Sequence, residues 1–228
     1  AQLNSKINNL SKQFSWEDKF SFIRNIDYSL FEYKSIIKKI EDRVFKPFKN
    51  DEKQDILGRA YKIFLSRAGK AENKNIILTP DHIKSMMVKL AELTKDDVVL
   101  DTCTGSGGFL MESMETMTRL AHGDPDKIKV IKENQLIGFE VDSVLFALAC
   151  SNMFLHGDGK TNLLYRSSLL NTNAQGTVNS TDTDLLNYIK RHKPTKVIIN
   201  PPYENNSSFK FAEQAIDYLE PNGRLIII

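Results

Sequence analysis

In the stretch VVLDTCTGSGGFLMESM (residues 98–114), an apolar strand pattern passes into a helical one through a glycine-rich turn. The apolar run Val98–Asp101 predicts a strand, and the spacing from Phe109 to Leu120 predicts a helix. Glycines between a strand and a helix permit a tight turn and a close approach of the backbone to a ligand. The spacing is neither GxGxxG nor a phosphate-cradling loop, and no lysine follows the glycines. The turn therefore predicts a nucleotide-type ligand that is not a triphosphate.

The alternation of strand and helix continues along the chain. Leu136–Glu140 predicts a strand and Val144–Phe154 a helix. Further short apolar runs predict strands at Leu163–Tyr165, Val197–Ile199 and Leu225–Ile228. Short apolar strands separated by helices are typical of a parallel, doubly wound sheet covered on both faces. The predicted fold class is therefore α/β with a Rossmann-like sheet, in which the polar stretch Asn171–Asp184 is expected to be a surface loop.

The N-terminal third has a different pattern. Residues 1 to about 70 show helical spacing without strand alternation, and a further helix is expected from Gln54 to Ser66. The polar stretch Gly69–Asn75 separates this region from the strands. We therefore expect an all-helical N-terminal domain over residues 1–72 and a sheet domain over 73–228. Because the chain stops within the apolar run that ends at Ile228, the sheet domain is expected to be truncated at its C-terminus.

Composition limits the kinds of protein this chain could be. With 228 residues, 41% hydrophobic content and no long apolar segment, the sequence predicts a globular, cytoplasmic protein without a membrane span. The only cysteines, Cys103 and Cys150, lack metal-ligand spacing, so no metal site is expected. Residues 1–80 hold 16 Lys and Arg against 10 Asp and Glu, which is compatible with contact to an anionic polymer.

Acidic residues end the first two predicted strands. Asp101 offers a carboxylate that suits a cationic ammonium group, such as the one in S-adenosylmethionine. Glu140 stands where acidic residues of dinucleotide-binding folds accept ribose hydroxyls. Glu140 lies 39 residues after Asp101 rather than about 20, and GxGxxG is absent, so a nicotinamide-dependent oxidoreductase is disfavoured.

The tetrapeptide Asn200-Pro201-Pro202-Tyr203 directly follows the strand predicted at Val197–Ile199. An amide and a backbone carbonyl could accept the hydrogens of a planar amine, and Tyr203 could stack on its ring. The prolines would fix the backbone so that the acceptors are aimed in advance. The alternative is an ordinary strand-to-turn connection in which proline limits the strand.

Taken in order, Leu78-Thr79-Pro80, DTCTGSGGFL at 101–110, GFE at 138–140 and the tetrapeptide resemble amino-group DNA methyltransferases of the gamma arrangement. The modification subunit of type I restriction-modification systems is the most similar type. The resemblance implies a class I S-adenosylmethionine-dependent methyltransferase sheet, and it makes Asn200, Pro201, Pro202 and Tyr203 the catalytic residues. The cofactor-binding residues that it implies are Ile76, Ile77, Leu78, Thr79, Pro80, Asp81, Asp101, Thr104, Gly105, Ser106, Gly107, Gly108, Glu140 and Ser168.

The sequence departs from the family pattern after the third predicted strand. Similar proteins usually place Asp or Asn before Ser-Leu, facing the adenine of the cofactor, whereas this chain reads Arg166-Ser167-Ser168-Leu169. A weaker hold on the adenine ring is the expected consequence. Leu78 also stands where an aromatic residue is common.

The implied activity is methyl transfer from S-adenosylmethionine to the exocyclic N6 amine of adenine in DNA, with the target base flipped out of the duplex. The implied partners are double-stranded DNA, a specificity subunit, a restriction subunit and a second copy of the modification subunit. Two alternatives stay open. One is methylation of a glutamine amide in protein, and the other is a cofactor-binding assembly subunit that is inactive without its partner.

Overall fold

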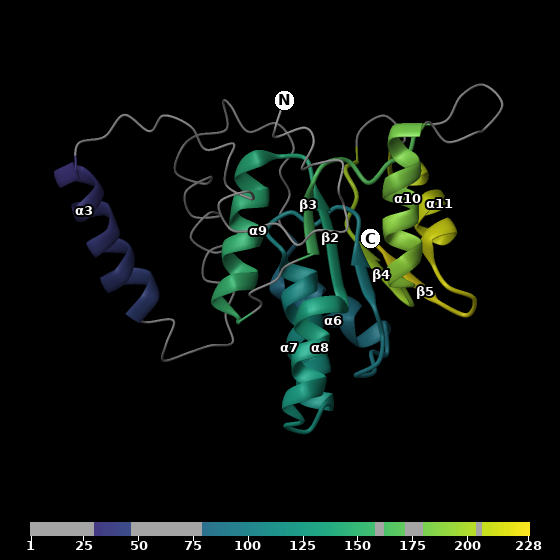
Figure 1. Cartoon of the computed structure of the whole chain (residues 1–228), viewed down its shortest axis with the longest axis horizontal. Coiled ribbons are helices and arrows are strands. Elements are labelled where there is room, and N and C mark those ends of the chain that lie inside the picture. The colour runs from purple at the N-terminus through teal and green to yellow at the C-terminus, as the bar shows by residue number, and fades with distance from the viewer. Residues whose placement is uncertain (1–29, 47–78, 158–161, 172–179, 204–206) are drawn as a thin grey trace.

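The computed structural model describes residues 30–46, 79–157, 162–171, 180–203 and 207–228. Its strands form one parallel sheet in the order β3-β2-β1-β4-β5 (Figure 1). The strands are β1 (Val99–Asp101), β2 (Leu136–Glu140), β3 (Asn162–Tyr165), β4 (Lys196–Ile199) and β5 (Arg224–Ile227). The predicted α/β class with a parallel sheet is therefore confirmed, and each strand lies within one residue of its expected bounds.

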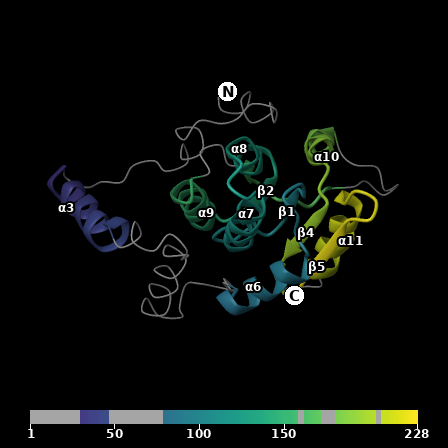
Figure 2. The ribbon, with the colours of Figure 1, turned by 90° about the horizontal axis from the view of Figure 1, so that it is seen from below.

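Helices cover both faces of this sheet. They are α6 (Asp81–Leu90), α7 (Gly108–Leu120), α8 (Pro125–Asn134), α9 (Ser143–Leu155), α10 (Ser180–His192) and α11 (Ser207–Tyr218). One hydrophobic core lies between the sheet and α6 to α9, and a second lies between the sheet and α10 and α11. Figure 2 shows α7 and α9 on one side of the strands and α10 and α11 on the other.

The apolar runs in the strands follow from this three-layer arrangement. Successive strand residues point to opposite faces, so Val99 enters the first core and Leu100 the second. In β4, Val197 and Ile199 face the second core while Ile198 faces the first. A strand that is buried on both faces needs apolar residues at every position, which explains why the sequence shows continuous runs rather than alternation.

The order of the strands decides where a ligand can bind. Strand β1 lies between β2 and β4, with Val99 paired to Leu136 on one side and to Lys196 on the other. The chain winds outward from β1 to β2 and β3, and then returns to β4 on the opposite side of β1. In open α/β sheets, ligands bind at the carboxyl ends of the strands beside such a reversal. The strand order therefore predicts a ligand site at the carboxyl ends of β1, β2 and β4.

Some helix expectations were wrong. Helix α10 begins at Ser180, inside the stretch Asn171–Asp184 that was expected to be a surface loop. The first turn of this helix is polar and was therefore mistaken for a loop. The helix buries Leu185, Tyr188 and Ile189 against the second core. Helix α6 ends at Leu90, and Glu92 just beyond it has a left-handed φ of 49°.

Helices α8 and α11 were not predicted from the sequence. The start of α8 has a clear local cause, because Asp124 accepts hydrogen bonds from the backbone amides of Asp126 and Lys127, and Pro125 occupies the first helical position. Proline is favoured there because the amide that it lacks would have no intrahelical partner.

Only part of the expected helical N-terminal domain is described. An α-helix, α3 (Leu30–Ile40), continues into a π-helix, η1 (Glu41–Phe45), so this stretch is helical as expected. The helix expected over Gln54–Ser66 and the boundary near residue 72 lie outside the described residues and stay predictions. Within the described ranges, no helix combines the length and apolar character needed to cross a membrane.

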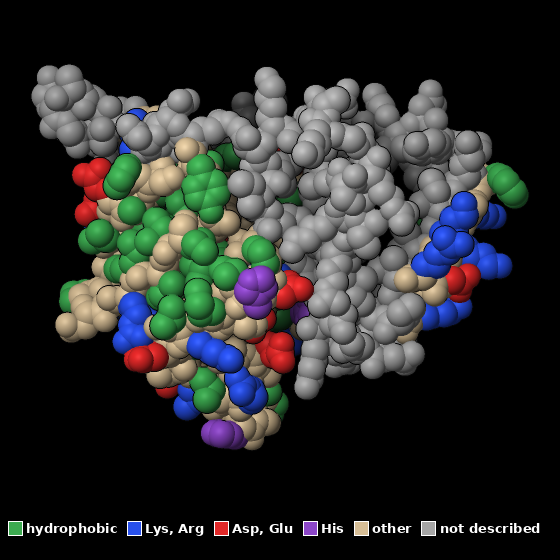
Figure 3. Space-filling model, turned by 180° about the vertical axis from the view of Figure 1, so that it is seen from behind, with side chains coloured by type: hydrophobic (Ala, Val, Ile, Leu, Met, Phe, Trp, Pro, Cys, Tyr) green, Lys and Arg blue, Asp and Glu red, His purple; other side chains and the backbone are tan. Residues whose placement is uncertain are grey.

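Apolar side chains are also exposed near the edge of the sheet. Phe209 and Ile216 of α11 are 76% and 62% exposed, and Ile227 of the edge strand β5 is 41% exposed. Figure 3 shows hydrophobic side chains gathered on one face of the molecule, seen from behind. The apolar residues of this domain are therefore not confined to the two cores.

Candidate functional site

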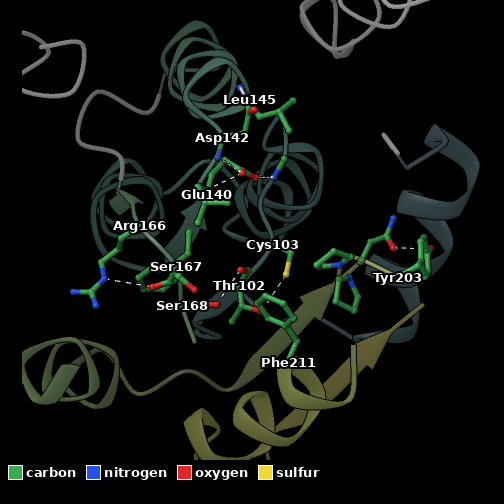
Figure 4. Close-up of a pocket in the computed structure, with 16 residues that line it drawn as sticks. Thr102, Cys103, Glu140, Asp142, Leu145, Arg166, Ser167, Ser168, Tyr203 and Phe211 are labelled. Atoms are coloured by element: carbon green, nitrogen blue, oxygen red, sulfur yellow. Dashed lines mark hydrogen bonds between the residues drawn. The ribbon is translucent and has the colours of Figure 1, made fainter. Parts of the chain in front are cut away.

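A cavity of about 320 Å³ opens at the carboxyl ends of β1, β2 and β4 (Figure 4). Its volume is in the range of about 300–1,000 Å³ that is usual for small-molecule sites. Its walls come from the turn after β1, the segments after β2 and β3, the tetrapeptide after β4, and Phe211 of α11. The cavity therefore lies where the strand order predicts a ligand site.

The turn after β1 relies on left-handed glycines. Gly105 has φ 56° and Gly107 has φ 86°, a region that side-chain-bearing residues rarely adopt. Gly107 is also the N-cap of α7. The turn is fixed to the neighbouring strand, because the Thr104 amide donates to the Phe139 carbonyl at 3.0 Å. The turn predicted from its glycines is thus present, and it brings the backbone of Gly105 to the cavity wall.

The turn makes close contacts with β2 and with α9. A Cβ atom on Gly138 of β2 would lie 2.5 Å from Thr104 Oγ1, so only glycine lets the turn approach the strand. On the other side, Asn152 of α9 donates from Nδ2 to the Ser106 carbonyl at 2.8 Å, and its side chain is buried. The turn is therefore clamped between β2 and α9.

Glu140 is already held by backbone amides. Its Oε2 accepts from Gly105 N at 2.8 Å, and its Oε1 accepts from Val141 N and Asp142 N, each at 2.8 Å. Burial raises the pKa of Glu140 above its ordinary value, although these three hydrogen bonds oppose the rise. A carboxylate has about four acceptor positions, so Glu140 keeps capacity for a hydroxyl donor at the cavity wall.

Asp101 lies beneath the turn and not in the cavity wall. The residue is fully buried, and its Oδ1 accepts from the Cys103 amide at 3.0 Å. Its buried Oδ2 has no hydrogen-bond partner among the described residues. Burial, with a smaller contribution from the charge of Glu140, raises the pKa of Asp101 to about 8. An unpaired buried carboxyl oxygen fits a cationic or hydrogen-donating group, but such a group reaches Asp101 only if the turn shifts.

At the end of β4, the tetrapeptide makes contacts that the sequence did not reveal. Asn200 donates from Nδ2 to Thr79 Oγ1 at 3.0 Å, and Tyr203 donates from its hydroxyl to Asn200 Oδ1 at 2.8 Å. Tyr203 is 58% exposed, whereas Pro201 is buried. The amide oxygen that was expected to accept from a substrate amine is thus occupied by Tyr203 in this structure.

The segment after β3 forms the far wall of the cavity. Ser168 is buried, and its hydroxyl donates to the Thr102 carbonyl at 3.1 Å while its own carbonyl accepts from the Tyr218 hydroxyl at 2.7 Å. Arg166 is fixed by an ion pair with Asp182 of α10 at 2.8 Å. Ser168 therefore shapes the wall through its structural contacts, with its hydroxyl already committed to Thr102.

The structure brings together about half of the residues expected in the site. Those that line the cavity are Gly105, Glu140, Ser168, Asn200, Pro201, Pro202 and Tyr203. Thr79 joins them through Asn200. The other expected residues that are described support the site from outside its wall: Pro80, Asp81, Asp101, Thr104, Ser106, Gly107 and Gly108. Ile76, Ile77 and Leu78 lie outside the described residues.

Several wall residues were not predicted. They are Thr102, Cys103, Phe139, Val141, Asp142, Leu145, Arg166, Ser167 and Phe211. Val141 and Asp142 directly follow the acidic end of β2, and Cys103 lies inside the glycine turn, so their positions next to expected residues were a usable signal. Phe211 had no such signal, because α11 itself was not predicted.

Comparison with known proteins gives a consistent result. The family described as N-6 DNA Methylase matches residues 52–228. The type II restriction enzyme and methyltransferase RM.BcgI of Heyndrickxia coagulans is 32% identical, with 92% of this chain and 34% of that protein aligned. The type I restriction enzyme HindI methylase subunit of Haemophilus influenzae is 27% identical, with 77% of this chain and 40% of that protein aligned. The chain thus spans between a third and two fifths of the length of these relatives.

Solved structures show the same fold. A modification subunit of a putative type I restriction enzyme from Vibrio vulnificus superposes with a TM-score of 0.57 at 20% identity, covering 75% of this chain and 38% of that one. The type I restriction enzyme EcoKI M protein gives a TM-score of 0.53 at 17% identity, covering 97% of this chain and 46% of that one. At these identities, the likeness is evidence for the fold.

Proposed function

The chain belongs to the N-6 DNA methylase family, and on that premise we propose that it transfers a methyl group from S-adenosylmethionine to the N6 amine of adenine in DNA. The observation that carries this proposal is the position of Asn200. Its neutral amide stands at the end of β4 and faces the same cavity as Glu140 at the end of β2. One cavity thus joins a site suited to a nucleoside cofactor with a site suited to a planar amine.

The residues at the end of β4 position the target amine. Asn200 Oδ1 and the Pro201 carbonyl accept its two hydrogens, which fixes the plane of the amine and increases electron density on its nitrogen. Tyr203 gives up its hydrogen bond to Asn200 and stacks on the base, a movement for which its exposed position leaves room. Adenine in a duplex cannot reach this cavity, so the base must be flipped out.

When bound, S-adenosylmethionine supplies its sulfonium methyl group, and the amine lone pair forms the N–C bond while the C–S bond breaks and leaves its electron pair on sulfur. The nitrogen then loses a proton to water. The contribution of the protein is positioning, since no residue becomes covalently attached in this step.

The cofactor residues are assigned on the same premise. Glu140 accepts ribose hydroxyls, and the turn that includes Thr104, Gly105, Ser106, Gly107 and Gly108 brings the backbone close to the cofactor. Asp101 takes the ammonium group after the turn shifts. The segment Ile76–Asp81 contributes to the methionine end, and Ser168 completes the wall near the adenine.

We also place this chain in a restriction-modification system in the cytoplasm. Its partners are double-stranded DNA, a specificity subunit, a restriction subunit and a second modification subunit. Two facts support this assignment. The proteins compared above carry the names of restriction enzymes and their methylase subunits, and the basic excess of residues 1–80 suits contact with DNA.

The test uses the whole protein, with and without its specificity subunit. The protein is incubated with DNA and S-adenosylmethionine carrying a labelled methyl group, and the digested nucleosides are separated by mass spectrometry. We expect label in N6-methyladenine, and labelling that is about 10²- to 10³-fold slower with Asn200→Ala. Label in protein glutamine would favour the glutamine alternative, and cofactor binding without any transfer would favour an assembly subunit.

Calorimetric titration with S-adenosylmethionine tests the cofactor site separately. Saturable binding is expected for the wild-type protein, and it should be lost in Glu140→Ala and Gly107→Asp. Aspartate at position 107 would force a side chain into the left-handed turn, beside Ala149. Undiminished binding in both variants would refute the assigned cofactor site.

A further inference from the structure

The hydrogen bond between Asn200 and Thr79 joins residues that are 121 positions apart. Asn200 follows β4, whereas Thr79 precedes α6, so no local sequence rule brings them together. Both residues are partly buried, and the two atoms are 3.0 Å apart. The resemblance assigns the Thr79 segment to the cofactor, but the hydroxyl of Thr79 contacts the residue that binds the target.

An amine substrate imposes one orientation on the Asn200 amide. Both hydrogens of the amine need acceptors, so Oδ1 must face the amine and Nδ2 must face away. Once Nδ2 faces away, it needs an acceptor of its own, because an unsatisfied buried donor is unfavourable. In this structure Thr79 Oγ1 is that acceptor.

Thr79 is well fixed for this task. The ring of Pro80 restricts the backbone of Thr79 to extended conformations, and the Pro80 carbonyl accepts from the amides of Ile83 and Lys84 at the start of α6. As a β-branched residue, Thr79 also has few side-chain rotamers.

Helix α6 also packs against the glycine-rich turn after β1. The buried Lys84 pairs with Asp81 at 2.8 Å. Its side chain packs so closely on Gly108 that a Cβ there would lie 2.7 Å from Lys84 Cδ. Thr79, which accepts the hydrogen bond from Asn200, therefore directly precedes a helix that is packed against the glycine-rich turn after β1.

We propose that Thr79 is a positioning residue for the target amine: its hydroxyl accepts from Asn200 Nδ2 and keeps Asn200 Oδ1 directed at the substrate. This inference rests on the proposed function. The hydroxyl of Tyr203, which donates to the same Oδ1 at 2.8 Å, marks where the amine hydrogen binds. When the base enters, the amine replaces Tyr203 at Oδ1, and the bond from Nδ2 to Thr79 stays in place.

The test compares Thr79→Val with Thr79→Ser in the whole protein. Valine keeps the shape of threonine but cannot accept a hydrogen bond, whereas serine keeps the hydroxyl. Single-turnover methyl transfer should fall about tenfold or more in Thr79→Val and recover to within about threefold in Thr79→Ser, as expected for loss of one buried hydrogen-bond acceptor. Affinity for S-adenosylmethionine, measured by calorimetry, should stay within about twofold in both variants, because the lost acceptor serves Asn200 and neither substitution changes the backbone of the segment Ile76–Asp81 that is assigned to the cofactor.

Thr118→Val is the matched control. Thr118 Oγ1 is buried in α7 and makes no hydrogen bond within the described part of the chain, so this variant should keep wild-type transfer rates. Weaker cofactor binding in Thr79→Val with an unchanged transfer rate would overturn the proposal, and so would equal rates in Thr79→Val and Thr79→Ser.

Crystal structures of the wild-type protein and Thr79→Val separate the two proposals. If the wild-type protein transfers no methyl group to DNA, the proposed function fails, and these structures alone decide the role of Thr79. We expect the Asn200 amide to leave its wild-type position in Thr79→Val. An Asn200 amide that stays in place without its acceptor would overturn the positioning role.

Discussion

The two sides of the cavity are built from different kinds of groups. At the ends of β1 and β2 stand the carboxyl groups of Asp101 and Glu140, both with raised pKa values and both held by backbone amides. At the end of β4 stand the neutral side chains of Asn200 and Tyr203, held by each other and by Thr79. The first side is ionisable, with Asp101 buried and Glu140 partly buried, and the second is neutral, with Asn200 partly buried and Tyr203 exposed.

The two sides are therefore expected to differ in how easily they rearrange. Buried carboxyl groups that accept from backbone amides cannot move without breaking the turn, so they give a fixed site at a cost in folding stability. Neutral amide and hydroxyl groups exchange hydrogen-bond partners at low cost, so they can release one partner and accept another. On the proposed cofactor side (Asp101 and Glu140), Glu140 is therefore preformed at the cavity wall, whereas Asp101 becomes accessible only when the turn shifts. On the proposed target side (Asn200 and Tyr203), rearrangement needs only an exchange of hydrogen-bond partners.

The largest expected effect is on the free energy of unfolding, which the buried carboxyl group of Asp101 should lower at neutral pH. The pKa of Asp101 rises from 3.8 to about 8 on folding, so the folded protein holds a proton that the unfolded chain releases. Its stabilising contribution is complete below about pH 4 and is lost as the pH rises towards 8. Asp101→Asn cannot titrate, so its stability relative to wild type should increase from pH 4 to pH 8, by on the order of 4 kcal/mol at pH 7.

Chemical denaturation of both proteins without cofactor, at several pH values, measures this difference. Titration with S-adenosylmethionine should show the opposite preference, with weaker binding by Asp101→Asn. Stability curves that run parallel across this pH range would show that Asp101 is not a buried titrating group, and the contrast between the two sides would lose its main support.

The next effect concerns the target side. Asn200→Ala removes the acceptor for the amine and should lower the methyl-transfer rate about 10²- to 10³-fold, as for loss of one preorganised hydrogen-bonding group. Cofactor affinity should be unchanged, because the contacts of Asn200 are with Thr79 and Tyr203. Rapid-quench kinetics and calorimetry on the same samples check both statements. A parallel loss of cofactor affinity would mean that the two sides are not independent.

A smaller effect tests how rigid the cofactor side is. In Gly138→Ala, the new methyl group would lie 2.4 Å from Leu163 Cδ2 and 2.5 Å from Thr104 Oγ1. Such overpacking should destabilise the protein by about 1–3 kcal/mol and weaken cofactor binding, since Thr104 belongs to the turn.

Gly123→Ala is the control for Gly138→Ala. A Cβ on Gly123 would meet no atom within 4 Å, although its φ of 83° adds backbone strain. Denaturation and calorimetry should show a stability loss without a change in cofactor affinity. If Gly138→Ala binds the cofactor normally, the turn is more adaptable than the close contacts indicate.

The smallest effect concerns Tyr203→Phe. The variant keeps the aromatic ring but removes the hydroxyl that competes for Asn200 Oδ1. A hydrogen bond of this kind is worth about 0.5–1.5 kcal/mol, so DNA affinity should rise by about tenfold or less. Equilibrium binding with labelled DNA measures the change. Weaker binding by Tyr203→Phe would show that the hydroxyl contacts the target and does not merely occupy its place.

Much of the framework was predictable because it depends on local patterns. The continuous apolar runs gave the strands within one residue, since burial on both faces leaves no polar position. The left-handed Gly105 and Gly107 were visible as a turn, because glycine alone adopts that conformation without strain. The start of α10 was missed because its polar first turn resembles a loop, and its apolar contacts depend on the tertiary structure.

The hydrogen bonds that fix the side chains of the site could not be predicted from the sequence. The bond between Asn200 and Thr79 depends on the placement of α6 against β4, and no periodicity of the sequence encodes it. The commitment of Ser168 to Thr102 and Tyr218 likewise depends on how the segment after β3 crosses the sheet. Sequence motifs predicted the site residues proposed above, whereas the hydrogen-bond partners of those residues required the three-dimensional structure.

The pairing of β1 with β4 also affects how the chain folds during synthesis. Strands β1, β2 and β3 can associate as soon as they emerge, but β1 meets Lys196 of β4 only 97 residues after Val99. At about 5–20 residues per second, the ribosome leaves the inner edge of β1 uncovered for roughly 5–20 s. The unpaired backbone N–H and C=O groups of this edge can pair with other nascent chains, and pairing across this separation is slow. The strand arrangement that forms the site thus delays completion of the sheet until β4 has been synthesised.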